Sequence, residues 1–182
     1  MTEKNKLGII LFIISEANFF LMLILAYVYY HRESSAVADR FLEPGKTGIN
    51  TIILLSSSLA VWLAERSFKK DSQRGFHSWL LVTIILGVVF LLGQGIEWSG
   101  LINQGITISQ GLFGTTFFTL TGFHGFHVFV GLVMLTILLG LAISGNIKGR
   151  QSRAVESISL YWHFVDAVWI VVFSVVYLGV YL

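Results

Sequence analysis

The 182-residue sequence has no cysteine and only one proline, and just 12% of its residues carry a charge. The lack of cysteine excludes disulfides, thiolate nucleophiles, Cys-ligated zinc and iron–sulfur clusters. The net charge of +2 is too small to indicate nucleic-acid binding. Hydrophobic residues make up 55% of the chain, and a soluble protein of this composition would expose large apolar patches to water. The composition therefore predicts a membrane protein.

Five apolar stretches are spread along the chain, at about residues 7–30, 48–64, 78–98, 112–144 and 157–182. All but the second reach the roughly 20 residues that a helix needs to cross a bilayer core. The second is short, with Thr47 or Asn50 as its expected N-cap, and the fourth is long enough to tilt. Period-two alternation, the mark of a barrel, is absent. We therefore predict an all-α polytopic membrane protein, a single domain over residues 1–182 with five transmembrane helices in one bundle.

Lysine and arginine are distributed unevenly between the two ends of the predicted helices. Nine lie at the end with the N-terminus and the second and fourth loops: Lys4, Lys6, Arg66, Lys69, Lys70, Arg74, Lys148, Arg150 and Arg153. Three lie at the other end: Arg32, Arg40 and Lys46. Because basic loops stay on the cytoplasmic or matrix side, this split predicts that the N-terminus is inside and the C-terminus outside.

Ionisable side chains occur within the predicted spans, where a charge costs at least about 2.5–3.5 kcal/mol near the bilayer centre. At a rise of about 1.5 Å per residue, five of them could meet in the inner half of the membrane. These five are Glu16, His124, His127, His163 and Asp166. Glu97, at the outer rim of the third span, is too far away to join them.

Three interpretations of these five residues are open. The favoured one is a structural network in which Asp166 accepts a hydrogen bond from a histidine and the helices are held in register. The second is a proton relay, because carboxylates and imidazoles exchange protons near neutral pH. The third, an iron or zinc site, has weak support, because di-iron bundles carry Glu-x-x-His pairs and these pairs are His-x-x-His and His-x-x-Asp. We therefore expect no metal ligands.

Small residues predict where helices approach each other closely. In the second and fourth spans these residues are Ser57, Thr119, Gly122 and Gly125. Packing within the bundle is favoured over contact with a partner subunit.

Four segments carry motifs with rare residue types in a fixed order. They are residues 11–20 (LFIISEANFF), 47–55 (TGINTIILL), 111–131 (GLFGTTFFTLTGFHGFHVFVG) and 161–169 (YWHFVDAVW). In order and spacing the sequence resembles subunit III of haem–copper cytochrome c oxidase over nearly the whole chain.

The resemblance implies an all-helical accessory subunit, without catalytic residues, of an enzyme complex that reduces oxygen to water and translocates protons. It implies no cofactor in this chain, haem and copper in partner subunits I and II, and a subunit that stabilises the catalytic subunit and supports proton uptake. Bound phospholipid, other membrane lipids and a larger respiratory supercomplex are further expected partners, but nucleic acid is not. The expected location is the inner (plasma) membrane of a bacterial cell, as a multi-pass protein.

Other assignments remain open. Many family members have seven helices, of which the first two form one wall of a lipid cleft. The five here match the last five, so either the cleft is open or another chain supplies that wall. A ubiquinol oxidase subunit III and a nitric oxide reductase accessory subunit are close alternatives. Glu16 favours the cytochrome c oxidase subunit, because ubiquinol oxidase chains tend to have aspartate at this position. More distant alternatives are an independent proton-linked channel or transporter and a membrane di-metal enzyme. The lack of an evident inverted repeat argues against the channel or transporter.

Overall fold

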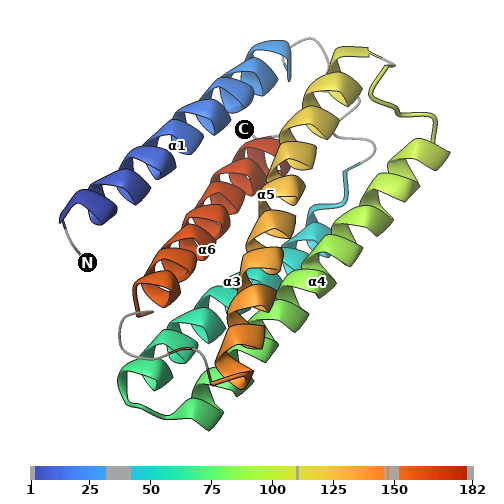
Figure 1. Ribbon diagram of the computed structural model, residues 1–182. Helices are drawn as coiled ribbons and strands as arrows, with labels where there is room; N and C mark the ends of the chain where they lie inside the picture. Colours follow the sequence, from blue (N-terminus) through green and yellow to red (C-terminus); the bar gives the residue numbers. More distant parts are fainter. Residues whose placement is uncertain (1–2, 32–41, 110, 146, 148–151, 180–182) are drawn as a thin grey trace.

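The computed structural model describes residues 3–31, 42–109, 111–145, 147 and 152–179. They form five long helices, shown in Figure 1: α1 (Glu3–His31), α3 (Pro44–Lys69), α4 (Gln73–Asn103), α5 (Gly111–Ile143) and α6 (Ser152–Phe173). A short π-helix, η2 (Ser174–Leu178), continues α6. All five helices are long and apolar enough to cross a membrane, and these residues include no strand. For the described residues, the prediction of an all-helical fold with five helices long and apolar enough to span a membrane is confirmed.

Helix α3 differs from its prediction because it is not a short span. It has 26 residues and begins at Pro44, a residue type that needs no hydrogen bond for its missing N–H in the first turn. Thr47 and Asn50 are therefore inside the helix, and the prediction that one of them caps it is wrong. Their side chains bond α4 instead: Thr47 donates to the Glu97 carboxylate (2.9 Å) and Asn50 to the Phe90 carbonyl (3.0 Å).

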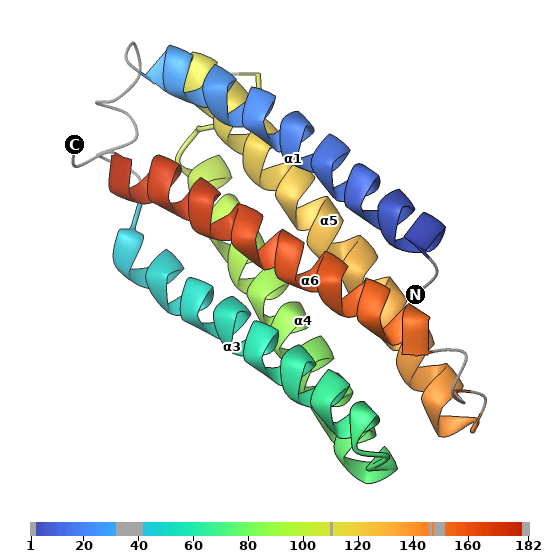
Figure 2. The ribbon, with the colours of Figure 1, turned by 90° about the vertical axis from the view of Figure 1, so that its left-hand side faces the viewer.

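The helices alternate in direction. One end of the bundle, at the right of Figure 2, holds the start of α1, the α3–α4 turn, the end of α5 and the start of α6. The turn brings Arg66, Lys69, Lys70 and Arg74 to this end. Of the other residues used to predict orientation, Arg32, Arg40, Lys148 and Arg150 lie outside the described ranges, and the orientation in the membrane stays a prediction.

Two sets of helix–helix contacts form the bundle. Helices α3 and α4 form a close antiparallel hairpin, while α5 packs against α4, α6 and α1. Helix α6 also lies along α3, as Figure 2 shows. Helix α1 is peripheral, with only 6% of its most apolar stretch buried, and it contacts α5 and, to a lesser extent, α6.

Trp162 on α6 fills the space between α4 and α5 and is fully buried. Two glycines face its indole ring. A Cβ atom added at Gly87 or at Gly131 would lie 2.8 Å from ring carbons, closer than side chains normally approach. These glycines therefore provide the room that lets three helices close around one large aromatic side chain.

Candidate functional site

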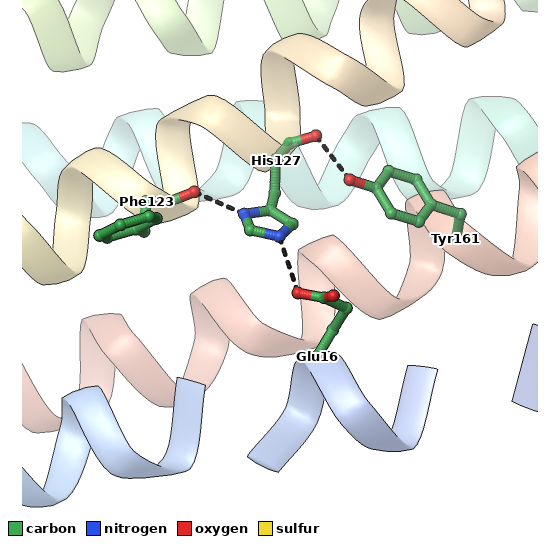
Figure 3. A network of polar contacts seen from close by, with 4 residues as sticks. All are labelled: Glu16, Phe123, His127 and Tyr161. Carbon is green, nitrogen blue, oxygen red and sulfur yellow. Dashed lines mark hydrogen bonds and ion pairs between the residues drawn. The ribbon is translucent and has the colours of Figure 1, made fainter. Parts of the chain in front are cut away.

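The first polar pair joins α1 to α5, as Figure 3 shows. Glu16 Oε2 lies 3.1 Å from His127 Nε2, and their side chains are 23% and 13% exposed. His127 Nδ1 lies 2.7 Å from the Phe123 carbonyl oxygen, which can only accept, so Nδ1 carries a hydrogen. The Tyr161 hydroxyl donates to the His127 carbonyl (3.1 Å) and ties α6 to the pair.

This geometry fixes what Glu16 and His127 can do chemically. With Nδ1 already protonated, a hydrogen bond between His127 Nε2 and Glu16 Oε2 requires one further proton. The proton can stand on the carboxyl group, giving a neutral pair, or on the imidazole, giving an ion pair. Both forms keep the hydrogen bond, so the pair can hold a proton and still connect the helices.

His124 does not join this pair, although it lies one helical turn away. It is fully buried, stacks on Trp169 (ring centroids 4.8 Å apart) and meets the edges of Phe90 and Phe20. Neither ring nitrogen has a hydrogen-bond partner among the described residues. His124 is therefore part of the aromatic core, and the expectation that all five polar groups meet is wrong.

The contact between α3 and α6 contains the second polar group. The Ser58 hydroxyl and His163 Nδ1 are 2.6 Å apart. Asp166 is only 2% exposed, and the Ser58 hydroxyl faces it, but neither carboxyl oxygen makes a well-formed hydrogen bond within the described ranges. The expectation that a histidine donates to Asp166 is therefore wrong, because His163 is bonded to α3 instead.

Three more side-chain hydrogen bonds connect α3 and α6, and the sequence analysis missed them. Trp162 donates to Ser57 (2.9 Å), Trp169 donates to Thr51 (2.9 Å), and Ser159 donates to Glu65 (2.9 Å). A signal for them exists in the sequence. Trp162 and Trp169 are seven residues apart on one helix face, and a buried indole N–H needs an acceptor.

Glu97 forms a separate polar group near the end of α4, at the end of the bundle opposite to the α3–α4 turn. Its two carboxylate oxygens accept from Thr47 (2.9 Å) and Gln94 (3.0 Å), and the Tyr177 hydroxyl lies close to it. Hydrogen bonds to Glu97 thus join α3 to α4 here, next to η2.

Three of the four residues predicted to pack helices, Ser57, Gly122 and Gly125, face side chains of other helices. Ser57 is fully buried, and Gly122 faces the Trp98 ring, which would lie 3.1 Å from an added Cβ. Gly125 faces Leu91 at 3.9 Å, and Thr119 is half-buried. The tightest glycine contacts between helices are at other positions, including Gly87 and Gly131.

Comparison with known proteins gives matches along the whole chain. The family model described as cytochrome c oxidase subunit III matches residues 1–181. Cytochrome c oxidase subunit 3 of Synechocystis sp. is 38% identical over 180 residues, which cover 97% of this chain and 76% of that protein. The Thermostichus vulcanus protein of the same name is 35% identical (97% and 88% covered), and that of Mycosarcoma maydis is 37% identical (94% and 64% covered). The chain thus spans most of the first two relatives and under two thirds of the third.

Proposed function

Because the chain belongs to the cytochrome c oxidase subunit III family, we propose that it is a non-catalytic accessory subunit of a haem–copper oxygen reductase. The match of the family model to residues 1–181 is the observation that carries this proposal. The relatives named above are all cytochrome c oxidase subunits, so a ubiquinol oxidase or a nitric oxide reductase is not favoured. The chain contributes to oxygen reduction as a member of the complex and stabilises the catalytic subunit.

We place haem and copper in partner subunits I and II. The side chains that the structure describes include no group of three or more His, Asp or Glu residues that could hold a metal ion. The two polar groups inside the bundle are instead joined to serine, tyrosine and backbone atoms. We further propose, from its family membership, that this chain binds the catalytic subunit, other members of a respiratory supercomplex, and lipid.

Co-purification tests this assignment. We expect the chain, extracted in a mild detergent and purified through a tag, to elute with haem-containing subunits and with the absorption spectrum of an oxidase. A stable haem-free oligomer that conducts protons in vesicles would instead identify an independent channel or transporter, and would refute the proposal.

We further propose a multi-pass protein of the inner (plasma) membrane, with the N-terminus inside. Support comes from the α3–α4 turn, which brings four basic residues to the end of the bundle where α1 begins. Since the chain has no cysteine, single cysteines at Ser72 and Gln104 are unique labels. We expect an impermeant maleimide to label Gln104→Cys in intact cells and Ser72→Cys only after lysis. The reverse pattern would contradict the orientation.

We further propose that the chain supports proton uptake into the catalytic subunit. The pair formed by Glu16 and His127 favours it, because the pair retains its hydrogen bond with the shared proton on either residue. Its partial exposure at the α1–α5 contact leaves it accessible from outside the bundle. A purely structural role for the same pair is the alternative, and substitution of Glu16, described in the Discussion, distinguishes the two.

A further inference from the structure

A groove runs between the first half of α3 and the second half of α4, away from the polar groups inside the bundle. Its volume is about 590 Å3, which lies within the roughly 300–1,000 Å3 of typical ligand sites. Apolar side chains form most of its walls, among them Ile49, Ile53, Leu92 and Ile96. Lys46 and Glu97 lie at its polar end. We call it the α3–α4 groove.

Two glycines of α4 create this groove. At Gly93 the helices touch, because an added Cβ would lie 2.6 Å from the Asn50 amide oxygen. Gly100 lies seven residues further along the same helix face. It also lines the groove, but an added Cβ there would have no neighbouring atom within 4 Å. The helices are thus held together at one glycine and leave open space at the other.

The dimensions of the groove match one leaflet of a bilayer. Its lining runs from Val89 on α4 to Gln104, which follows this helix, and from Glu43, which precedes α3, to Ile53 on that helix. At 1.5 Å per residue these stretches are about 22 Å and about 15 Å long, while half of a hydrocarbon core is about 15 Å thick. The groove is also open sideways, since Ile96 is 73% exposed. An acyl chain can therefore enter from the surrounding lipid.

Charges at the polar end indicate which headgroup fits. Lys46 and Glu43 form an ion pair there (2.6 Å), and Glu97 adds a second carboxylate. Two acids and one base disfavour an anionic headgroup. A headgroup with both an ammonium and a phosphate can place the first near the carboxylates and the second near Lys46. A primary ammonium also donates hydrogen bonds, which a quaternary ammonium cannot do.

We propose that the α3–α4 groove binds a phospholipid with a zwitterionic, primary-amine headgroup of the phosphatidylethanolamine type. One acyl chain lies along the apolar walls, the ammonium lies at Glu97 and Glu43, and the phosphate lies at Lys46. The site is separate from the pair of Glu16 and His127, and it does not depend on how protons reach the catalytic subunit.

The glycines provide a matched pair of variants for the test. Gly100→Leu places a side chain inside the groove, whereas Gly95→Leu places one outside it, and both positions have open space around Cβ. The purified oxidase complex is reconstituted in vesicles of equal phosphatidylethanolamine and phosphatidylglycerol, extracted again, and its retained lipid is counted by native mass spectrometry. We expect one retained phosphatidylethanolamine per chain in the wild type and in Gly95→Leu. In Gly100→Leu retention falls about tenfold, equivalent to roughly 1.4 kcal/mol.

Two further measurements address the headgroup and the occupant. Glu97→Gln keeps the shape of the side chain, and we expect it to abolish the preference for phosphatidylethanolamine over phosphatidylglycerol. A benzophenone amino acid at Ile96 should give an adduct with the mass of a phospholipid. The proposal is overturned if Gly100→Leu retains as much lipid as Gly95→Leu, or if the wild type has no headgroup preference. A cross-link to protein, or no lipid adduct, also overturns it, because another chain would then cover the groove or nothing would bind there.

Discussion

Replacing Glu16 by glutamine separates the two roles open to its pair with His127. Because His127 Nδ1 donates to the Phe123 carbonyl, Nε2 can accept a hydrogen bond. A glutamine amide at position 16 can donate to it, so the link between α1 and α5 survives in neutral form. What the variant loses is the exchangeable proton of the carboxyl group.

The expected cost in stability is small. A hydrogen bond to a charged group contributes about 1.5–3 kcal/mol and a neutral one about 0.5–1.5 kcal/mol, so Glu16→Gln should cost on the order of 1 kcal/mol. Glu16→Leu is different, because it leaves the imidazole nitrogen without a partner, at about 1–3 kcal/mol. Only the leucine variant should weaken assembly measurably.

The assay is oxygen consumption by the purified complex between pH 6 and pH 9. If Glu16 helps to deliver protons, turnover of Glu16→Gln should fall below that of the wild type as the pH rises, since free protons then become scarce. Near pH 6 the two should be similar. Asn18→Ala is a matched control, because Asn18 is an exposed residue on α1 whose bond, within the part of the chain that the structure describes, is to the carbonyl of Ile14 on its own helix.

Two results would refute this reasoning. If Glu16→Gln turned over like the wild type at every pH while remaining assembled, the pair would have no part in proton supply. If Glu16→Gln lost subunit I on purification, the pair would be structural, and the estimated cost of about 1 kcal/mol would be too low.

The remaining predictions concern stability, measured as the thermal midpoint of the purified complex in detergent. Gly131→Ala brings a methyl group to 2.8 Å from the Trp162 ring and should destabilise by about 1–3 kcal/mol. Gly140→Ala, where the added methyl meets nothing, should be neutral or stabilising; an equal loss at both positions would contradict the packing argument. Ser58→Ala removes the partner of a half-buried histidine and should cost about 1–3 kcal/mol, whereas Ser56→Ala, on the exposed face, should cost little. Equal midpoints for the two serine variants would argue against the bond between α3 and α6.

Helix number and type could be predicted because they depend on local properties. A stretch of about 20 apolar residues has to satisfy its backbone internally in a bilayer, and a helix does so without help from other segments. Helix ends were less predictable. The second span was expected to begin near Thr47 or Asn50, but Pro44 starts it three or more residues earlier. Thr47 and Asn50 bond α4 from inside the helix, a partner that is not readable along one chain.

The polar groups show that depth in the membrane does not by itself predict which side chains bond to each other. The rise per residue along a helix predicts similar membrane depths for Glu16, His124, His127, His163 and Asp166. It does not predict which side of the bundle each of these side chains faces. Helix α1 lies at the edge, so Glu16 bonds α5, whereas α6 lies against α3, so His163 bonds Ser58. The order of the helices around the bundle, and not their depth, decides these partners.

The sequence by itself determined five apolar helices, their alternating direction, and the membership that its motifs indicate, because hydrophobic length and rare residue patterns are readable along one chain. Tertiary structure alone decided which polar groups bond to each other, that His124 belongs to an aromatic core, and that Gly93 and Gly100 line a groove beside α3. The physical reason is that each of these depends on which helix faces which, and that choice is made by packing around Trp162 and the glycines opposite it.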